Sequence, residues 1–530
     1  MLDFFRNFFS KKSTWIAFSL IIFGTIIRVL GLSIFPAGFN QDEASIGYEA
    51  FCLLSDGHDR NGIEYPIHLI AWGNGQNVLY AYLLMPIIQI FGLTPFSVRL
   101  VNAILSSLSL LIFYLLFKSA FDKRKALISL AFLVICPWSI MAGRWGLESN
   151  IFPVIFLIAI FFLFKGITKN QVYYLISVVF FAMSLYAYGT SYLVVPLFFL
   201  FIFTYLIVFK KISWKFGLLS FFLFLILAFP MILFVIINQF DLEAIQIGKI
   251  TIAKMITNRT GNIFNIFSGD FFATLAKNII RFFNIVFLQT DNLLYNAIPA
   301  FGLIYHLSLP FFFFGLYFIL KKKIWKEPIH FIILAWLACS IILGMTIHAN
   351  INRINIIVFP LIYFALQGLF YFVKEIIPEA YRVKTKRFLV LFYLLSFLFF
   401  AGYYLTVFDE KNKEGFAYGL GEAIEYVNEK FPTDTINITT HSINMPYIYV
   451  CFFSKIDPVV FRETVVYDHE SLRNGFGRVL SLNRYHFVSD ATTKENIAII
   501  SQDEFWLSNT IKDRKQEQFG NYYVLFPNEN

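Results

Sequence analysis

Apolar runs of membrane-span length recur along most of the chain. Each is close to the ~20 residues that cross the ~30 Å hydrocarbon core of a bilayer. The chain is 58% hydrophobic, with 68 Phe and a mean hydropathy of +0.66, a balance that soluble domains do not show. We therefore predict a polytopic α-helical membrane protein with about eleven spans, at residues 14–34, 98–117, 126–142, 151–165, 171–188, 191–209, 215–237, 297–320, 328–346, 354–373 and 387–407.

A further apolar stretch, VLYAYLLMPIIQIFG at residues 78–92, decides the topology. It is short for a span and contains Pro86 and Gln89, so it fits a helix lying in the membrane interface. If it is not a span, the basic clusters from RNFFSKK to KEIIPEAYRVKTKR all fall on one side of the membrane. The positive-inside rule makes that side the cytoplasm. We expect the N-terminus to be cytoplasmic.

Three loops and the C-terminal tail then face outward. A transmembrane domain, residues 1–407, would contain the first outer loop (35–97, with interfacial helices), a short turn (142–150) and a long outer loop (238–296). The more polar tail, residues 408–530, is long enough for a separate extracytoplasmic domain. Its helical pattern GFAYGLGEAIEYVNEKF and its strand-like stretches TINITT, NIAII and YYVLF predict a small α/β domain.

The charge balance and the cysteines point to no additional partner class. The formal charge of +9 would suit nucleic acid, but the basic residues lie in short clusters between apolar runs, where they orient the protein in the membrane. The four cysteines are scattered, without paired or metal-like spacing. We expect neither a nucleic-acid partner, nor a disulfide framework, nor a cysteine metal site.

Three acids follow the outer end of the first predicted span. Asp42 and Glu43 come just after the helix-breaking Pro36 and Gly38. The pattern EASIGYEAFCLL, residues 43–54, predicts an amphipathic helix at the membrane surface, with the two acids at its N-terminus and Glu49 on its polar face. An ordinary acidic N-cap would explain Asp42 and Glu43 equally well.

The second outward turn, AGRWGLESN at residues 142–150, is unusually rich in functional groups. Arg144, Glu148 and Asn150 stand where a simple connection needs only Gly and polar filler. Arg144 and Glu148 are four residues apart and could merely pair along a helix. Ionisable groups in two outward loops nevertheless suggest one shared site.

A third outward turn, HANINRINIIVFP, carries Arg353 at the start of a span, with His348 nearby. The planar guanidinium of Arg353 suits a phosphate, because it donates two hydrogen bonds to two oxygens. An Arg that reaches the lipid headgroups is the alternative. Taken together, outward carboxylates and arginines suit group transfer from a phosphate-bearing lipid, with a carboxylate as base and an Arg stabilising the leaving phosphate.

Several of these motifs, in this order, resemble one known family. They are DEASIGYEAFCLL after the first span, YAYLLMPIIQIFGLTPFSVRLVNAILS leading into the second, and CPWSIMAGRWGLESNIFP at the second outward turn. YAYGTSYLVVPL and NRINIIVFPLIYF match more loosely. The chain is similar to the membrane-embedded GT-C glycosyltransferases related to protein O-mannosyltransferases and to the bacterial aminoarabinose transferase of lipid A (glycosyltransferase family 39-like).

The resemblance implies a function and a set of site residues. In that family an Asp of the first outward loop is the catalytic base, and a polyprenyl-phosphate sugar is the donor. Asp42 would take the role of base, with Glu43 beside it. The substrate-binding residues would be Arg144, Glu148, Asn150, Arg353, His348 and Tyr80. Inverting transfer from such a donor needs a base and phosphate stabilisation, so no cofactor is required and a divalent metal stays open.

The chain departs from the family at one place. Relatives often carry a Lys-Pro-Pro-like stretch before the Tyr that opens the interfacial helix, whereas this chain reads GNGQNVLY at residues 73–80. If that Lys holds a substrate in relatives, this chain must hold its substrate differently.

The leading hypothesis is a glycosyltransferase of a bacterial plasma membrane, acting on a protein, lipid or cell-wall glycan acceptor at the outer face. A transporter or flippase of a lipid-linked saccharide is the alternative. It should place ionisable residues near the middle of several spans, but here Arg28 is the main charged residue within one. An inactive relative that only binds lipid-linked sugar is a third possibility.

Overall fold

The structure is a computed structural model that describes residues 12–73, 75–256, 271–473, 477–491, 496–507, 511 and 514–527. Contacts divide the chain into two units. The helical unit comprises Met1–Leu30, Asn102–Phe229 and Asn265–Thr406. The sheet unit comprises Gly31–Val101, Pro230–Phe264 and Val407–Asn530. Segments of two predicted outer loops thus group with the C-terminal tail, and the predicted domains 1–407 and 408–530 stay a prediction.

Long apolar helices dominate the described residues. Seven are long and apolar enough to cross a membrane, or eight if the bent pair α6 (Lys123–Ile135) and α7 (Pro137–Gly143) is one span. The seven are α5 (Pro95–Ala120), η1 with α8 (Glu148–Asn150, Phe152–Thr168), α10 (Ser191–Val208), α11 (Trp214–Gln239), α14 (Pro328–Thr346), α15 to η5 (Ile351–Ile354, η4 Asn355–Ile357, α16 Val358–Tyr371, η5 Phe372–Ile376) and α17 to α18 (Glu379–Tyr403, η6 Tyr404–Phe408, Asp409–Asn412).

Four shorter apolar helices accompany them. Three coincide with predicted spans: α2 (Lys12–Val29), α9 (Val172–Ala187) and α13 (Ser308–Lys321). The fourth, α4 (Leu79–Phe91), is the predicted interfacial helix. The predicted segments are therefore found largely as helices, apart from residues 30–34 and 297–307, while the count of eleven spans stays a prediction.

Prolines set several helix boundaries in the helical unit. Pro137 opens α7, and α6 and α7 meet there at a bend of 57°. The predicted span 297–320 is helical only from Ser308, because residues 297–307 form turns that contain Pro299 and Gly302, the latter at φ 69°. A short 3₁₀ turn, η3 (Ile324–Lys326), leads into α14.

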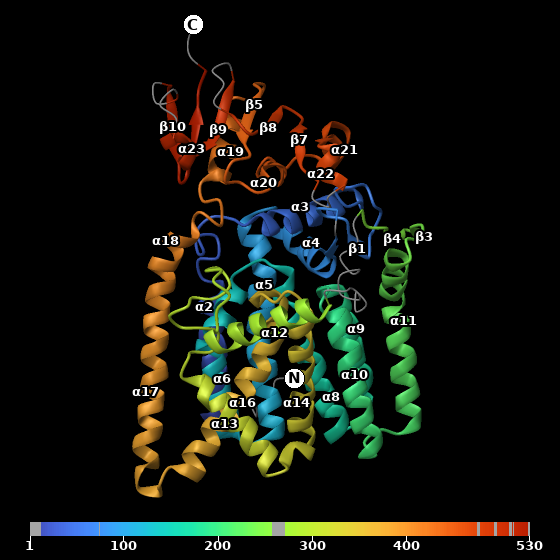
Figure 1. Cartoon of the computed structure of the whole chain (residues 1–530), viewed down its shortest axis with the longest axis vertical. Coiled ribbons are helices and arrows are strands. Elements are labelled where there is room, and N and C mark those ends of the chain that lie inside the picture. Colours follow the sequence, from blue (N-terminus) through green and yellow to red (C-terminus); the bar gives the residue numbers. More distant parts are fainter. Residues whose placement is uncertain are drawn as a thin grey trace. The chain divides into compact units, whose positions relative to one another are not determined.

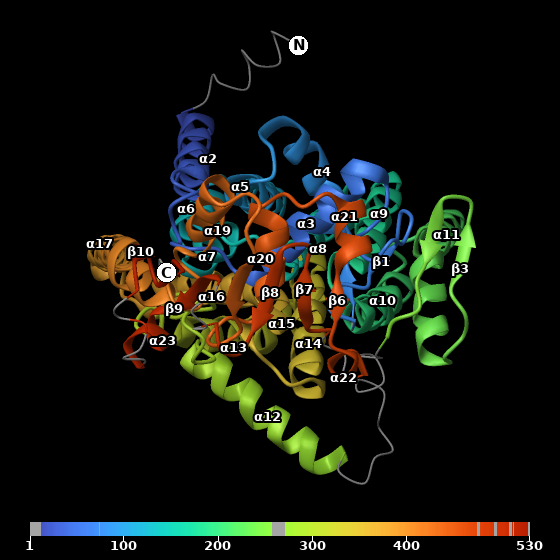
Figure 2. The ribbon, with the colours of Figure 1, turned by 90° about the horizontal axis from the view of Figure 1, so that it is seen from above.

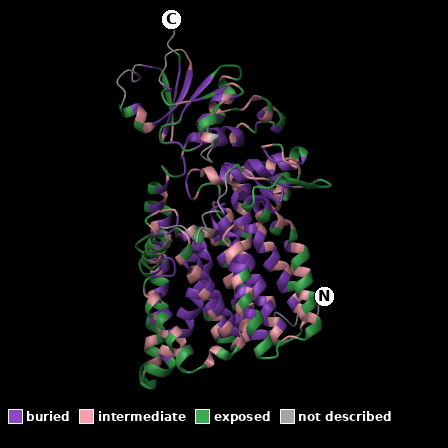
Figure 3. Ribbon diagram, turned by 45° about the vertical axis from the view of Figure 1, so that its right-hand side comes forward, coloured by how far each residue is buried: buried purple, intermediate pink, exposed green. Residues whose placement is uncertain are grey.

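Close helix packing forms the centre of the helical unit. Helices α13 and α16 approach so closely that a Cβ on Gly315 would lie 2.1 Å from the Phe364 carbonyl oxygen, and one on Gly368 would lie 1.9 Å from that of Phe311. Small residues permit such approach between apolar helices. Burial is greatest along the central helices, whereas α17 stands at the edge of the unit and is largely exposed (Figures 1 and 3).

The predicted long outer loop contains a helix that the sequence reading missed. Helix α12 (Phe271–Leu288) runs across the direction of α14 and packs against it (Figures 1 and 2). Phe282 of α12 lies against Gly344 of α14. Its apolar residues are interrupted by Lys277, Asn278 and Arg281, so it lacks the unbroken apolar run that marks a span.

The sheet unit is built around a seven-stranded mixed sheet of order β10-β11-β9-β5-β8-β7-β6. Strand β5 (Ile436–Thr439) pairs in parallel with β8 on one side and β9 on the other. The other strands are β6 (Val466–Tyr467), β7 (Val479–Leu482), β8 (Tyr485–Val488), β9 (Ile497–Ser501), β10 (Gln516–Phe519) and β11 (Tyr522–Leu525). The helices are α19 (Leu420–Lys430), α20 (Pro446–Phe453), α21 (Pro458–Thr464), α22 (His469–Arg473) and α23 (Gln502–Leu507). The predicted α/β character of the tail, and with it the fold class, is confirmed.

The rest of the sheet unit consists of helices and hairpins from the predicted outer loops. Helix α3 (Gln41–Asp56) packs against α4 and α20, and ends at Gly57, whose φ of 80° is left-handed and favours glycine. Two hairpins complete the unit: β1 (His68–Leu69) with β2 (Gln76–Asn77), and β3 (Ile245–Ile247) with β4 (Ile250–Ile252).

Candidate functional site

The first turn of α3, in the sheet unit, is a capping box. The Asn40 side chain accepts a hydrogen bond from the Asp42 backbone N–H at 2.9 Å, and the Asn40 N–H donates to Glu43 Oε2 at 3.1 Å. Such reciprocal bonds satisfy N–H groups that a helix otherwise leaves without partners. The start of the helix, and with it the position of Asp42, is therefore firmly set.

Arg99, near the start of α5, holds this turn from the other side, and the sequence reading missed it. Its Nε and Nη2 donate to Glu43 at 2.8 and 3.1 Å. Its remaining donors reach the carbonyl oxygens of Leu32 (3.0 Å), Pro36 (2.9 Å) and Gly38 (2.7 Å). All five guanidinium N–H groups are thus used at a fully buried side chain. Its sequence signal was an Arg at the edge of an apolar run.

The three acids of residues 42–49 differ in accessibility. Glu43 and Glu49 are both 0% exposed, whereas Asp42 is partly exposed. The predicted helix is present, but the expectation that Glu49 lies on its polar outer face is wrong. Helix α20 and the segment 57–60 cover that face, so Glu49 is inside the sheet unit.

Glu49 belongs to a second buried charge cluster. Its Oε2 accepts the Arg60 backbone N–H at 3.0 Å, and its Oε1 lies 3.2 Å from Arg60 Nε. Arg60 also donates to the Ser45 hydroxyl at 3.0 Å and stacks on the Trp72 ring. Burial, and then the charge of Glu49, raise the pKa of Asp59 to about 7. Burial likewise raises the pKa of Glu49.

Tyr80 opens α4, as predicted, but it lies inside the protein. Its ring is fully buried, and its hydroxyl donates to the Val98 carbonyl oxygen at 2.7 Å. This bond ties α4 to the first turn of α5, one residue before Arg99. Tyr80 could therefore act on substrate binding only indirectly, by helping to position Arg99.

In the helical unit, Arg144 lies at the C-terminal end of α2. Its Nη1 donates to the carbonyl oxygens of Ile27 (2.7 Å) and Leu30 (2.8 Å). The last carbonyls of a helix have no partner within the helix, and a guanidinium both bonds them and complements the helix dipole. Arg144 is almost completely buried, so this contact fixes the second outward turn to the first span.

The second and third predicted turns meet in this unit. Asn355 Nδ2 donates to the Ser149 carbonyl oxygen at 2.9 Å and lies 3.4 Å from Asn150 Oδ1. Asp291 Oδ2 accepts from the Ile351 N–H at 2.8 Å and so adds the long outer loop to the same cluster. Sequence reading found Asn150 but neither Asn355 nor Asp291, because polar residues in separate loops give no sign of their contact.

Two arginines and a histidine lie close together in this unit. Arg353, at α15, is exposed and donates to the His348 carbonyl oxygen at 3.1 Å. Arg281, from α12, donates through Nε to the carbonyl oxygen of Ala349. Partial burial, and then the positive charges of Arg281 and Arg353, lower the pKa of His348. Two guanidinium groups anchored to adjacent carbonyls make a candidate anion site, of which Arg281 was not foreseen.

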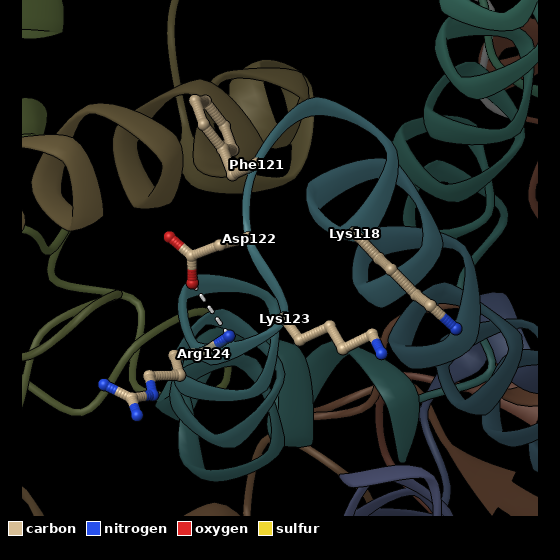
Figure 4. A pocket seen from close by; sticks show the side chains of 5 residues that line it. All are labelled: Lys118, Phe121, Asp122, Lys123 and Arg124. Carbon is tan, nitrogen blue, oxygen red and sulfur yellow. Dashed lines mark hydrogen bonds between the residues drawn. The ribbon is translucent and has the colours of Figure 1, made fainter. Parts of the chain in front are cut away.

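The helical unit also has a surface hollow at the turn between α5 and α6, which the capping of α6 explains. It is lined by Lys118, Phe121, Asp122, Lys123 and Arg124 at the turn between α5 and α6 (Figure 4). Asp122 caps α6 by accepting the backbone N–H groups of Arg124 and Lys125 at 2.9 and 3.0 Å. This is an open hollow over a capped turn, and the cationic side chains around it belong to a predicted cytoplasmic cluster.

The possible metal ligands of the described residues are scattered rather than clustered. All four cysteines, Cys52, Cys136, Cys339 and Cys451, are buried and free. In the part of the chain that the structure describes, no group of three or more His, Cys, Asp or Glu side chains is placed to hold a metal ion.

Comparison with known proteins shows what this chain and its fold are similar to. Residues 76–240 match the family described as dolichyl-phosphate-mannose-protein mannosyltransferase. The fold is similar to that of ArnT from Cupriavidus metallidurans bound to undecaprenyl phosphate, with a TM-score of 0.59 and 11% identity over 97% of this chain and 98% of that one. The predicted resemblance to the GT-C membrane glycosyltransferases is confirmed, and the fold is ArnT-like.

A second likeness is more distant. The archaeal oligosaccharyltransferase AglB from Archaeoglobus fulgidus, in complex with an inhibitory peptide and a dolichol-phosphate, has a TM-score of 0.50 and 14% identity over 83% of this chain and 63% of that one. No curated protein matches the sequence. The fold is therefore assigned over nearly the whole chain, and a family match in sequence covers residues 76–240.

Proposed function

We propose that this protein transfers a sugar from a polyprenyl-phosphate donor to an acceptor hydroxyl at the outer face of a bacterial plasma membrane, with Asp42 as general base. The observation that carries the proposal is the accessibility of Asp42. It is the one partly exposed acid of residues 42–49, in a helix turn that Arg99 and a capping box hold rigid. A general base has to reach its proton, and a fixed position favours the transfer.

The transfer needs one proton acceptor and one anion stabiliser. The Asp42 carboxylate takes the proton of the acceptor hydroxyl, whose oxygen attacks the anomeric carbon of the donor. The bond between that carbon and the phosphate oxygen breaks, and its electrons leave on the phosphate. Glu43, with both oxygens bonded, is a positioning residue in this scheme.

Arg353 and Arg281 are the proposed ligands of the donor phosphate. Their anchoring on the carbonyls of residues 348 and 349 orients the guanidinium groups without neutralising their charge. His348, Arg144, Glu148 and Asn150 would complete or support the binding surface. ArnT binds undecaprenyl phosphate and AglB binds dolichol-phosphate, which supports a polyprenyl-phosphate donor for this chain.

The proposed orientation rests on the basic turns. Lys125 of the α5–α6 turn lies over the Phe370 ring at the end of α16, and Lys322 pairs with Glu375 at 3.1 Å. The turns after α5, α13 and α16 therefore meet at one end of the helical unit, which the positive-inside rule assigns to the cytoplasm. The N-terminus would lie on that side, and the C-terminal tail outside.

The decisive experiment uses the purified full-length protein with radiolabelled polyprenyl-phosphate sugars. Lipid-phosphate release should fall by at least about 100-fold in Asp42→Asn, because general-base catalysis contributes about 10²–10⁴-fold. Asp503→Asn, which alters an exposed acid in the first turn of α23, is the matched control and should behave as wild type. Unchanged release in Asp42→Asn would exclude the base, and lipid movement without release would indicate a flippase.

Single cysteines test the orientation in intact cells. Glu429→Cys, in the C-terminal tail, should react with a membrane-impermeant maleimide from outside, and Lys123→Cys should react only after lysis. The native cysteines are buried, so the background should be low. The reverse pattern would overturn the proposed topology.

A further inference from the structure

A cavity in the sheet unit lies where two parallel strands end. It has a volume of about 530 Å³, and it is lined by Thr440 directly after β5 and by Ser489 directly after β8. After β8 the chain continues to β9, on the opposite side of β5. In α/β sheets the carboxyl ends of strands at such a change of side form the usual ligand crevice. The volume is within the ~300–1,000 Å³ of small-molecule sites.

The cavity wall combines aromatic faces with hydrogen-bonding groups. Tyr447, in the first turn of α20, and Phe487 of β8 supply the aromatic surface. Asp468, Arg478 and Asn444 supply a carboxylate, a guanidinium and an amide. The Asp468 N–H donates to the Arg478 carbonyl oxygen at 2.8 Å, just beyond the register shift between β6 and β7. Such irregularities in strand pairing commonly re-aim side chains beside a site.

The loop between β5 and α20 has an unusual backbone. Ser442 (φ 58°) and Met445 (φ 52°) are both in the left-handed region, which L side chains rarely adopt. Non-glycine residues in this region cost free energy, and they cluster where a binding surface has to be held in one shape. Met445 itself lines the cavity, so the strained loop is part of its wall.

Helix α20 connects the cavity to the helix that carries Asp42. Its first turn lines the cavity, the charges of Asp42 and Glu43 act on Tyr449, and Phe452 lies against Gly47 of α3. Beyond its end, the carbonyl oxygen of Ile456 accepts a hydrogen bond from the Tyr48 hydroxyl at 3.0 Å. At 1.5 Å per residue, α20 is only about 12 Å long.

The side chains around this cavity match the chemistry of sugars. A sugar presents adjacent hydroxyls, each both donor and acceptor, and a ring face of C–H groups. Paired donors and acceptors on planar Asp, Asn and Arg groups satisfy the hydroxyls, and aromatic rings cover the apolar face. A purely anionic ligand would be opposed by Asp468, and a purely apolar one would offer no acceptor to the Arg478 guanidinium; one Asp468 oxygen already accepts the Glu470 N–H at 3.1 Å.

We propose that this cavity binds a saccharide unit of the acceptor, so that another unit of the same glycan reaches the Asp42 carboxylate. The assignment rests on the proposed function, because it treats the bound glycan as the acceptor. It specifies the acceptor as a glycan and names Arg478, Asp468 and Asn444 as residues that recognise it.

Direct binding tests the cavity without any turnover. Maltotriose, mannotriose and chitotriose are titrated by calorimetry into the full-length protein in lipid nanodiscs, because detergents with sugar headgroups would compete. At least one should bind, and Arg478→Gln and Asp468→Asn should each weaken it by about tenfold or more. Asn444→Trp, which fills the cavity from an exposed position, should abolish binding. Asp434→Asn, an exposed acid of the same unit outside the cavity, should not alter it.

The possible outcomes distinguish a failure of the saccharide-site proposal from a failure of the proposed glycosyltransferase function. Binding of none of the three sugars, or binding unchanged in Arg478→Gln and Asn444→Trp, overturns the saccharide site. A variant that loses binding but has the same thermal unfolding temperature as wild type is still folded. Saccharide binding without phosphate release from any donor overturns the proposed function and the acceptor role, while the cavity remains a saccharide site. With release present, Arg478→Gln should raise the KM for the acceptor glycan, whereas the control Asp434→Asn should leave that KM unchanged.

Discussion

Helix α3 carries three carboxylate–arginine pairs that differ in how completely the hydrogen-bonding groups of each pair are satisfied. At its start, Glu43 pairs with Arg99, and each N–H of that guanidinium has an acceptor. In its middle, Glu49 pairs with Arg60, but Arg60 Nη2 and Asp59 Oδ2 have no hydrogen-bond partner among the described residues. At its end, Asp56 pairs with Arg462 at a partly exposed position.

The three pairs show that burial and hydrogen-bond satisfaction determine how an ion pair affects rigidity, pH response and stability. A buried charge is costly unless its hydrogen-bonding capacity is filled, so the Glu43–Arg99 pair can fix a rigid turn. The Glu49–Arg60 pair shares its interior with a second carboxylate, Asp59, and so responds to pH. The exposed Asp56–Arg462 pair competes with water and contributes little.

The largest difference in stability should appear between the variants Arg99→Lys and Arg60→Lys. Arg99→Lys leaves at least two of five buried acceptors without a donor, because Lys has three donors, and should destabilise the protein by roughly 3–5 kcal/mol. Arg60→Lys should cost only about 1 kcal/mol, because the Arg60 side chain donates one hydrogen bond, to Ser45, besides its ion pair. Thermal unfolding of both variants in one detergent measures the difference. Equal losses would remove the distinction between the two pairs.

A pH effect is expected at the middle pair. The pKa of Asp59 is raised to about 7 in the folded protein from an ordinary value near 4, so the folded state holds a proton that the unfolded state loses. Stability should therefore fall as pH rises from about 4 to about 7, by an amount on the order of 4 kcal/mol, and then level off. Asp59→Asn should flatten this profile when unfolding is followed between pH 4 and 8. A profile that is as steep in the variant would assign the effect to another group.

The contact between α3 and α20 should be sensitive to a single methyl group. A Cβ on Gly47 would lie 2.6 Å from the Phe452 ring and 2.9 Å from Val98, so Gly47→Ala should destabilise by about 1–2 kcal/mol. Gly402→Ala, in α17 where a Cβ meets nothing within 4 Å, should instead stabilise by about 0.5–1 kcal/mol. Differential scanning fluorimetry of the two variants shows whether their changes in stability have opposite signs. A stabilised Gly47→Ala would mean that α3 and α20 are less closely packed.

The smallest effect is expected at the exposed pair. Asp56→Asn should change stability by no more than about 0.5 kcal/mol at moderate salt, because solvent screens the Asp56–Arg462 interaction. Repeating the measurement in 0.5 M NaCl should remove even this change. A loss comparable to that of Arg99→Lys would show that partial exposure does not weaken the pair.

Much of the fold was predictable because it depends on local composition. The apolar runs gave the positions of the long helices, and the alternating pattern of the tail gave β5, β9 and β11. Helix α12 was not predicted, since its polar residues interrupt the apolar run. Residues 297–307 were wrongly taken as helical, because hydropathy does not register the turns around Pro299 and Gly302.

The candidate site was predictable in its residue types but not in its contacts. The acids of α3 and the turn at residues 144–150 stood out as polar groups beside apolar runs. Arg99, Asn355 and Arg281 did not, because each acts through a partner more than 50 residues away. The placement of Glu49 was wrong for a similar reason, since helix periodicity predicts one covered face and cannot show that the C-terminal tail covers the other.

The sequence by itself determined that this is a multi-pass membrane protein, where most of its long apolar helices lie, and which family its outer motifs resemble. These properties follow from hydropathy, which acts residue by residue along the chain. The tertiary structure decided which acid stays accessible, that Arg99 holds its helix turn in place, and where a sugar-sized cavity opens at the ends of β5 and β8. Burial and hydrogen-bond satisfaction depend on residues brought together from distant segments, and that information exists only once the chain has folded.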